Sequence, residues 1–223
     1  MSITFYCASS SDALPSVMNT PVAINTPSKT STEYSLFDSK RLERVFERCF
    51  GSKFNTVLLG GSEEPFYRPS KVSGEQPQIY YRADYFASAL HEIAHWCIAG
   101  EARRQSPDYG YWYSPEGRDE EQQKAFESAE AKPQALEWYF SIACAYNFKI
   151  SPDNLDMKTG EIRDSSRFKQ SILERARYWQ SNGLPTRGEQ YFAALAREFE
   201  TLDSSGQPLK LSAVELDPGD LVG

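Results

Sequence analysis

Residues 85–100 read YFASALHEIAHWCIAG, and this stretch decides how the chain is organised. Its apolar residues recur at helical spacing up to a final glycine, which predicts a helix over 85–99. Within it lies the pattern H-E-x-x-H, in which His91 and His95 are four residues apart. Residues at this spacing lie on one face of a helix, one turn from each other. The two imidazoles can therefore bind one divalent metal ion, with Glu92 beside them to take a proton from bound water or to orient a ligand.

The third ligand of such a site cannot be a histidine, because the 223-residue chain contains only two histidines and both are in this motif. Two histidines and one carboxylate leave open positions on the metal, which suits zinc hydrolases and equally non-haem Fe(II) enzymes that activate dioxygen. The downstream helix offers Glu127, Glu130 and Glu137. Glu130 lies just before Pro133, where a helix end can point a side chain inward, but the residues alone leave the choice among the three acids open.

The helical and strand patterns fill residues 35–202, the predicted metal-binding domain. Helices are expected over about 42–50 with a stop at Gly51, 85–99, 120–146 with a kink or break at Pro133, 165–181 and 187–202. Strands are expected over 56–59 and 78–82, and a third is weighed at 66–68. Strands early and helices late indicate an α+β domain, with a small sheet of about three to four strands packed against a helical layer.

The two ends of the chain have a different composition. Residues 1–34 are rich in Ser, Thr, Ala, Asn and Pro with few charges, which predicts a poorly ordered extension. Residues 203–223 form a predicted C-terminal tail, in which 209–214 is expected to add an edge strand or stay loose.

Composition narrows the class of protein. A net charge of −7 disfavours nonspecific binding to nucleic acid. The chain has no apolar run of about 18 residues, so no membrane span is expected, and its start shows no signal-peptide pattern. The four cysteines have no C-x-x-C spacing, and Cys49, Cys97 and Cys144 fall in apolar helical stretches. Buried free thiols and a cytoplasmic location are therefore expected.

Several longer segments resemble the elongation factor P hydroxylase family, and the resemblance spans about residues 38–202. They are ALHEIAHWCIAGEARR at 89–104, DYGYWY at 108–113, PEGRD at 115–119, FESAEAKPQALEW at 126–138, DNL at 153–155 and NGLP at 182–185. These segments are far more specific than H-E-x-x-H alone. The resemblance implies hydroxylation of the β-lysyl-modified lysine of translation elongation factor P. It also implies a fold similar to that of a small bacterial metal-dependent endoribonuclease family.

The resemblance further implies a site with two histidines and one carboxylate that is suited to Fe(II), with O₂ as cosubstrate. His91 and His95 match the imidazole ligands, and Glu130 matches the acidic ligand, with Glu137 kept as the alternative. Iron fits a hydroxylation because zinc has no accessible redox step. Glu92 points to another part of the helix surface than its neighbours, so a role in proton handling is expected.

The loop over residues 108–118, DYGYWYSPEGR, carries four aromatic side chains. Such a loop either packs down as a lid or forms a recognition surface beside the metal. Our hypothesis is that Tyr111, Trp112 and Glu116 line the substrate entrance.

Two other classes of function stay open at this point. A zinc-dependent hydrolase, either a peptidase or an endoribonuclease, would use Glu92 as the general base on a zinc-bound water. The non-enzymatic alternative is a protein-binding module stabilised by a metal. Open coordination positions speak against that module, because structural zinc sites are closed and usually rich in cysteine.

Overall fold

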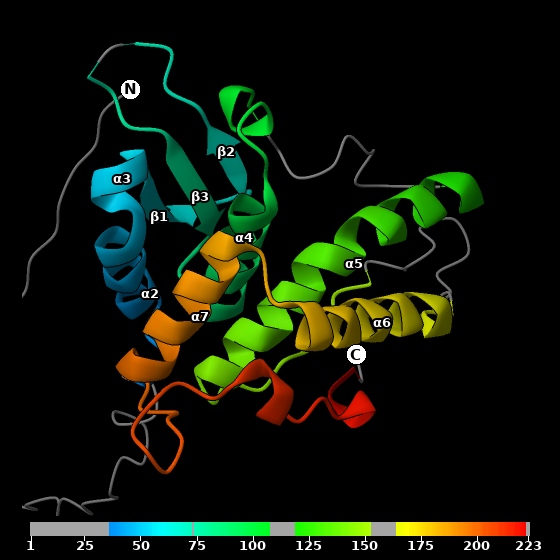
Figure 1. The fold of residues 1–223 in the computed structure, drawn as a ribbon. Helices are drawn as coiled ribbons and strands as arrows, with labels where there is room; N and C mark the ends of the chain where they lie inside the picture. The colour runs from blue at the N-terminus through cyan, green and yellow to red at the C-terminus, as the bar shows by residue number, and fades with distance from the viewer. Residues whose placement is uncertain (1–35, 73, 108–118, 153–163, 222–223) are drawn as a thin grey trace, which may run out of the picture.

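A computed structural model of the chain describes residues 36–72, 74–107, 119–152 and 164–221. Over these residues the fold is α+β, as predicted, with a three-stranded sheet packed against helices (Figure 1). In chain order the elements are α2 (Ser39–Phe46), a π-helical turn (Glu47–Gly51), α3 (Ser52–Phe54), β1 (Val57–Ser62), β2 (Phe66–Arg68), β3 (Gln78–Arg82), α4 (Phe86–Ile98), a 3-10 turn (Arg103–Gln105), α5 (Glu120–Ala143), α6 (Ser166–Asn182), α7 (Thr186–Glu198) and two 3-10 turns (Leu211–Ala213 and Pro218–Leu221).

The sheet has the order β1-β3-β2, with β3 parallel to β1 and antiparallel to β2. Leu58 pairs with Ile79, and both are buried together with Tyr81, two residues further along β3. Because residues two apart share one face of a strand, these side chains form the buried face of the sheet. Helix α2 packs against β1 and α4 against β3, so α4 lies between the sheet and the remaining helices.

Helix α5 runs unbroken through Pro133, so of the predicted kink or break at this proline the break is wrong. Proline removes one backbone donor and crowds the preceding turn, but the helix is secured on both sides of it. At its start, Asp119 accepts from the Gln122 N–H at 2.8 Å, and the Gln122 side chain accepts from the Asp119 N–H at 2.9 Å. After the proline, Gln134 is buried and its side chain bonds both backbone groups of Ser151. Burial of the helix in the folded domain thus outweighs the local tendency of proline to interrupt a helix.

The first helical segment also differs from its prediction, because it does not stop at Gly51. The backbone stays helical through α3 and turns at Asn55, whose φ of 49° is left-handed. Asparagine tolerates this conformation better than most residues, so it ends the helix here in place of the glycine.

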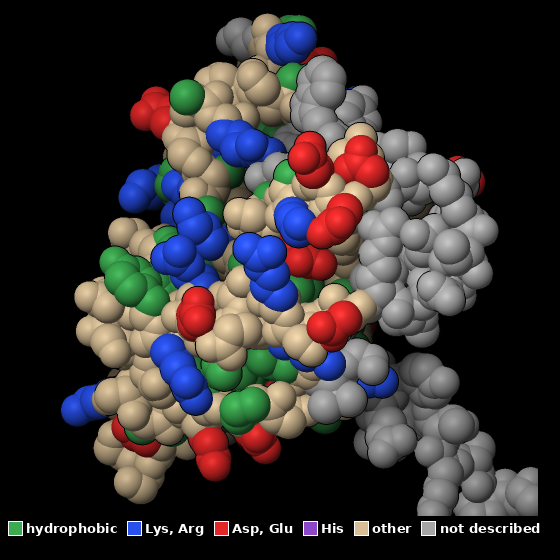
Figure 2. Space-filling model, turned by 90° about the vertical axis from the view of Figure 1, so that its right-hand side faces the viewer, with side chains coloured by type: hydrophobic (Ala, Val, Ile, Leu, Met, Phe, Trp, Pro, Cys, Tyr) green, Lys and Arg blue, Asp and Glu red, His purple; other side chains and the backbone are tan. Residues whose placement is uncertain are grey.

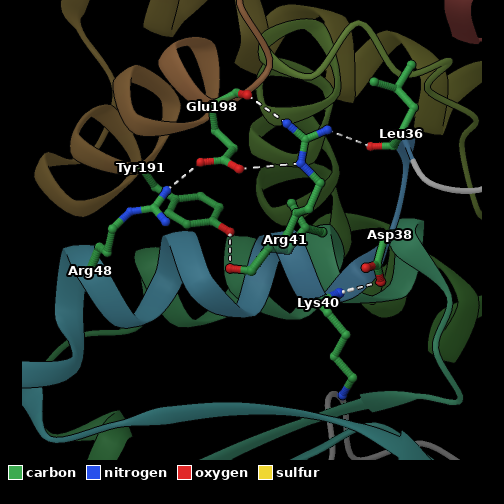
Figure 3. A network of polar contacts seen from close by, with 8 residues as sticks. Leu36, Asp38, Lys40, Arg41, Arg48, Tyr191 and Glu198 are labelled. Carbon is green, nitrogen blue, oxygen red and sulfur yellow. Dashed lines mark hydrogen bonds and ion pairs between the residues drawn. The ribbon is translucent and has the colours of Figure 1, made fainter.

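Polar contacts fix α2 on the last long helix (Figure 3). Arg41 donates to the Glu198 carbonyl oxygen at 2.7 Å and to the Leu36 carbonyl oxygen at 3.0 Å. The Glu198 carboxylate lies 2.6 Å from the Arg48 guanidinium, and Tyr191 donates to the Leu42 carbonyl at 3.2 Å. Two helices that are far apart in the sequence but packed together are thus joined by polar and charged groups at the edge of the core.

Replacing Arg41 by Ala is expected to lower the free energy of unfolding by about 1–2 kcal/mol, because two backbone carbonyls and Glu198 lose a charged donor. Thermal and urea unfolding measure the change. The exposed Arg44 on the same helix provides the control, and Arg44→Ala should shift the free energy by less than about 0.5 kcal/mol. Equal effects of the two substitutions would contradict a role for the network.

The segment after α7 packs onto the helical layer. Val214 and Leu221 are buried, Gln180 donates to the Val214 carbonyl at 2.7 Å, and Trp138 donates to Asp220 at 3.2 Å. Residues 209–214 therefore neither add an edge strand nor stay loose, and they end in a 3-10 turn. The predicted N-terminal extension lies outside the described residues.

Cys97 and Cys144 are buried and Cys49 is half-buried, and all three are free thiols, as expected. Cys7 lies outside the described residues. Within those ranges, no helix combines the length and the apolar character needed to cross a membrane.

Candidate metal centre

Two packed helices bring four ionisable side chains together. His91 and His95 lie one turn apart on α4, and Glu130 and Glu137 lie seven residues apart on α5, which places them two turns apart on one face. Because α4 and α5 pack against each other, the histidine pair meets the glutamate pair across the interface.

Three of these side chains converge on one point. The Nε2 atoms of His91 and His95 are 3.0 Å apart, and the Glu130 carboxylate oxygens lie 3.3 Å and 3.4 Å from them. Two atoms each about 2.1 Å from a metal ion are about 3.0 Å apart at a right angle and about 3.4 Å apart at the tetrahedral angle. The three donors therefore fit one divalent ion of this size. They also form a group that can hold a metal in the described part of the chain.

Glu137, the alternative metal ligand, contacts the other ring nitrogen of His91 and not the three converging donor atoms. Its carboxylate lies 2.7 Å from Nδ1 of His91, the ring nitrogen that faces away from Glu130. When Nδ1 carries the proton and donates it to Glu137, the lone pair of Nε2 points toward His95 and Glu130. Such a contact orients a histidine for metal binding and fixes its tautomer.

The two glutamates are buried, with only 4% and 7% of Glu130 and Glu137 exposed. Buried carboxylates are costly unless they are paired. Burial alone would lower the pKa of His91, but the charges of Glu137 and Glu130 outweigh it and hold that pKa well above its usual value. Burial would likewise raise the pKa of Glu130, but His95 and His91 outweigh it and keep that pKa well below its usual range. The charges of the two histidines and the two glutamates therefore offset the cost of burying them.

The centre is open on one side. The side chains of His91 and His95 are 22% and 20% exposed. His95 lines a hollow of about 570 Å³ between the C-terminal end of α4 and the middle of α5, whose lining includes Ile98, Ser128 and Lys132. Structural zinc sites are closed, whereas catalytic sites keep a position open to water or substrate. Among the described residues, the partial exposure of the two histidines resembles the second kind of site more than the first.

Two arginines hold the end of the helix that carries the histidines. Arg187 on α7 donates to the carbonyls of Trp96 (3.0 Å) and Ala99, and Arg104 donates to the Ala99 carbonyl at 2.7 Å. Positive charges are favourable at a helix C-terminus. The Arg187 guanidinium also lies 4.9 Å from the centroid of the Trp96 ring. Sequence reasoning missed Arg187, because nothing local connects it with a helix some 90 positions earlier.

No other described residue considered from the sequence belongs to the group of His91, His95 and Glu130 that could hold a metal. Glu92 lines a small pocket of about 30 Å³ that His95, Trp96 and Arg103 also line. Glu127 accepts from Gln123 at 3.2 Å and is absent from the group that could hold a metal. Tyr111, Trp112 and Glu116 lie outside the described residues.

Comparison with known proteins links this chain to one family. The sequence model described as elongation factor P hydroxylase matches residues 45–207, which include all four side chains of the centre. The chain is also 42% identical over 159 residues to a protein of Haemophilus influenzae named elongation factor P lysine hydroxylase. The match covers 71% of this chain and 88% of that protein.

Proposed function

Because the chain belongs to the elongation factor P hydroxylase family, we propose that it adds a hydroxyl group to the β-lysyl-modified lysine of elongation factor P. The observation that carries the proposal is the convergence of His91, His95 and Glu130 in a centre that is open on one side. The name of the Haemophilus influenzae relative supports the same substrate.

Fe(II) is the metal that we propose for this centre, with zinc as the less favoured choice. Two imidazoles and one carboxylate suit either ion, but hydroxylation requires a redox-active metal. An unactivated C–H bond reacts only with a strong oxidant. Bound Fe(II) would activate O₂, the proposed cosubstrate, to provide that oxidant.

The side chains around the donors have distinct proposed roles. Glu137 fixes the orientation of the His91 ring through the 2.7 Å contact to Nδ1. Glu92 lines the small pocket beside His95, which suits a carboxylate that moves a proton near the metal without binding it. The hypothesis that Tyr111, Trp112 and Glu116 line the substrate entrance stays part of the proposal.

The zinc-dependent hydrolase remains the rival enzyme, because the same motif places Glu92 next to the histidines. The metal-stabilised binding module is less favoured, since the two histidines are partly exposed, whereas structural metal sites are closed. Similarity to the endoribonuclease fold and a cytoplasmic location stay predictions.

The test of the proposal is the mass of elongation factor P. In cells that lack this protein, the modified lysine should miss the mass of one oxygen atom. Incubation with the purified chain, Fe(II), air and an added two-electron reductant, which reduces the second oxygen atom of O₂ to water, should restore it. Metal analysis after anaerobic purification separates iron from zinc. An elongation factor P that keeps its oxygen in the deleted strain would refute the assignment.

Metal binding should depend on pH. The raised pKa of His91 means that its imidazole carries a proton in the neutral range when no metal is bound, and a metal must displace it. The affinity should therefore rise with pH, by about tenfold per pH unit below that pKa for one proton, and level off above it. Calorimetry in buffers of different ionisation enthalpy measures the released proton. A pH-independent affinity would contradict this coupling.

A further inference from the structure

A second hollow, of about 600 Å³, lies between α5 and α6, and we call it the basic groove. Its lining includes four basic side chains, Lys124, Lys132, Arg167 and Arg175, and two acidic ones, Glu127 and Glu174. The chain as a whole has a net charge of −7, so this positive excess is local. Figure 2 shows the side of the molecule toward which the N-terminal ends of α5 and α6 point, and across its middle several Lys and Arg side chains lie with Asp and Glu side chains among them.

The basic groove adjoins the metal centre. Ser128 and Lys132, one turn apart on α5, line both the basic groove and the hollow that contains His95. A ligand large enough to fill both hollows can therefore cover this ridge of α5 and touch the metal centre at the same time. A protein substrate has this size, whereas a free amino acid does not.

The charge of the basic groove determines which part of a substrate it can bind. The modified lysine is cationic, and the positive excess of the groove would repel it. An acidic stretch of protein surface is complementary to the same side chains. Tyr178, which is 53% exposed, adds an aromatic surface beside Arg175, whose guanidinium lies 5.3 Å from its ring centroid. Exposed Tyr and Arg are enriched where proteins meet.

We infer that the basic groove docks an acidic surface of the protein substrate while the modified lysine reaches the metal centre. The inference rests on the proposed function. A protein fits better than a nucleic acid, because Glu127 and Glu174 in the groove and the net charge of the chain would oppose a phosphate backbone.

The test compares two double charge reversals in the full chain. Arg167→Glu with Arg175→Glu alters the groove. Arg177→Glu with Arg197→Glu changes the net charge equally on exposed residues of α6 and α7 that are not in its lining. Calorimetry with β-lysylated elongation factor P should give a Kd raised about tenfold by the first pair and less than twofold by the second. The difference should shrink in high salt, because salt screens exposed charges.

A separate measurement of turnover distinguishes the docking inference from the proposed hydroxylase function. The groove variant should show a raised KM with an unchanged kcat. An unchanged Kd, or equal effects of the two pairs, overturns the docking inference even if the wild-type chain hydroxylates its substrate. Groove-dependent binding of an RNA oligonucleotide, with the Kd for the protein unchanged, also overturns it. Binding without any turnover by the iron-loaded wild type, when O₂ and a two-electron reductant are supplied, contradicts the proposed function and leaves the docking surface supported.

Discussion

Glu130→Gln is expected to abolish hydroxylation and to lower the affinity of the chain for metal by more than about 100-fold. Loss of a partner that only orients a ligand costs about 10–100-fold, and Glu130 itself supplies the only carboxylate that faces both Nε2 atoms among the described residues. Glutamine keeps the size of the side chain but removes its charge. Bound iron per chain after anaerobic loading and turnover of modified elongation factor P are the two measurements.

The matched control is Glu121→Gln, because Glu121 is an exposed glutamate in the first turn of the same helix. It should bind metal and turn over substrate like the wild type. Circular dichroism of both variants shows whether they are folded. A folded Glu130→Gln variant that retains iron and activity would exclude this carboxylate as a ligand.

The histidine pair could be predicted from the sequence because its geometry is local. A spacing of four residues on a helix fixes the relation of His91 to His95 whatever else the chain does. The three strands and the α+β class were also predictable, from short apolar runs followed by helical periodicity. The structure confirms both the helix that carries the pair and the sheet behind it.

The rest of the centre depends on how two helices dock. Glu130 and Glu137 share one face of α5, so periodicity alone could not distinguish the acid that faces both Nε2 atoms from the one that contacts Nδ1. The crossing of α4 and α5 decides this, and it follows from packing over the whole core. The same packing keeps α5 intact at Pro133, where the local rule predicted an interruption.

Glu137→Ala tests the second role and should weaken metal binding about 10–100-fold, less than Glu130→Gln does. Without the 2.7 Å contact to Nδ1, the ring of His91 loses the partner that sets its orientation and tautomer. Glu137→Gln keeps an acceptor oxygen, so it should recover part of the affinity. The metal Kd of each variant, measured by competition with a chelator, gives this order.

Excess metal separates orientation from ligation. If Glu137 acts only through His91, high Fe(II) should restore the turnover of Glu137→Ala, because all three donors are still present. The same excess should leave Glu130→Gln inactive, since a donor is missing. The reverse pattern, with Glu137→Ala beyond rescue and Glu130→Gln restored, would make Glu137 the ligand and Glu130 the supporting acid. The 3.3 Å and 3.4 Å distances from Glu130 to both Nε2 atoms predict the first pattern.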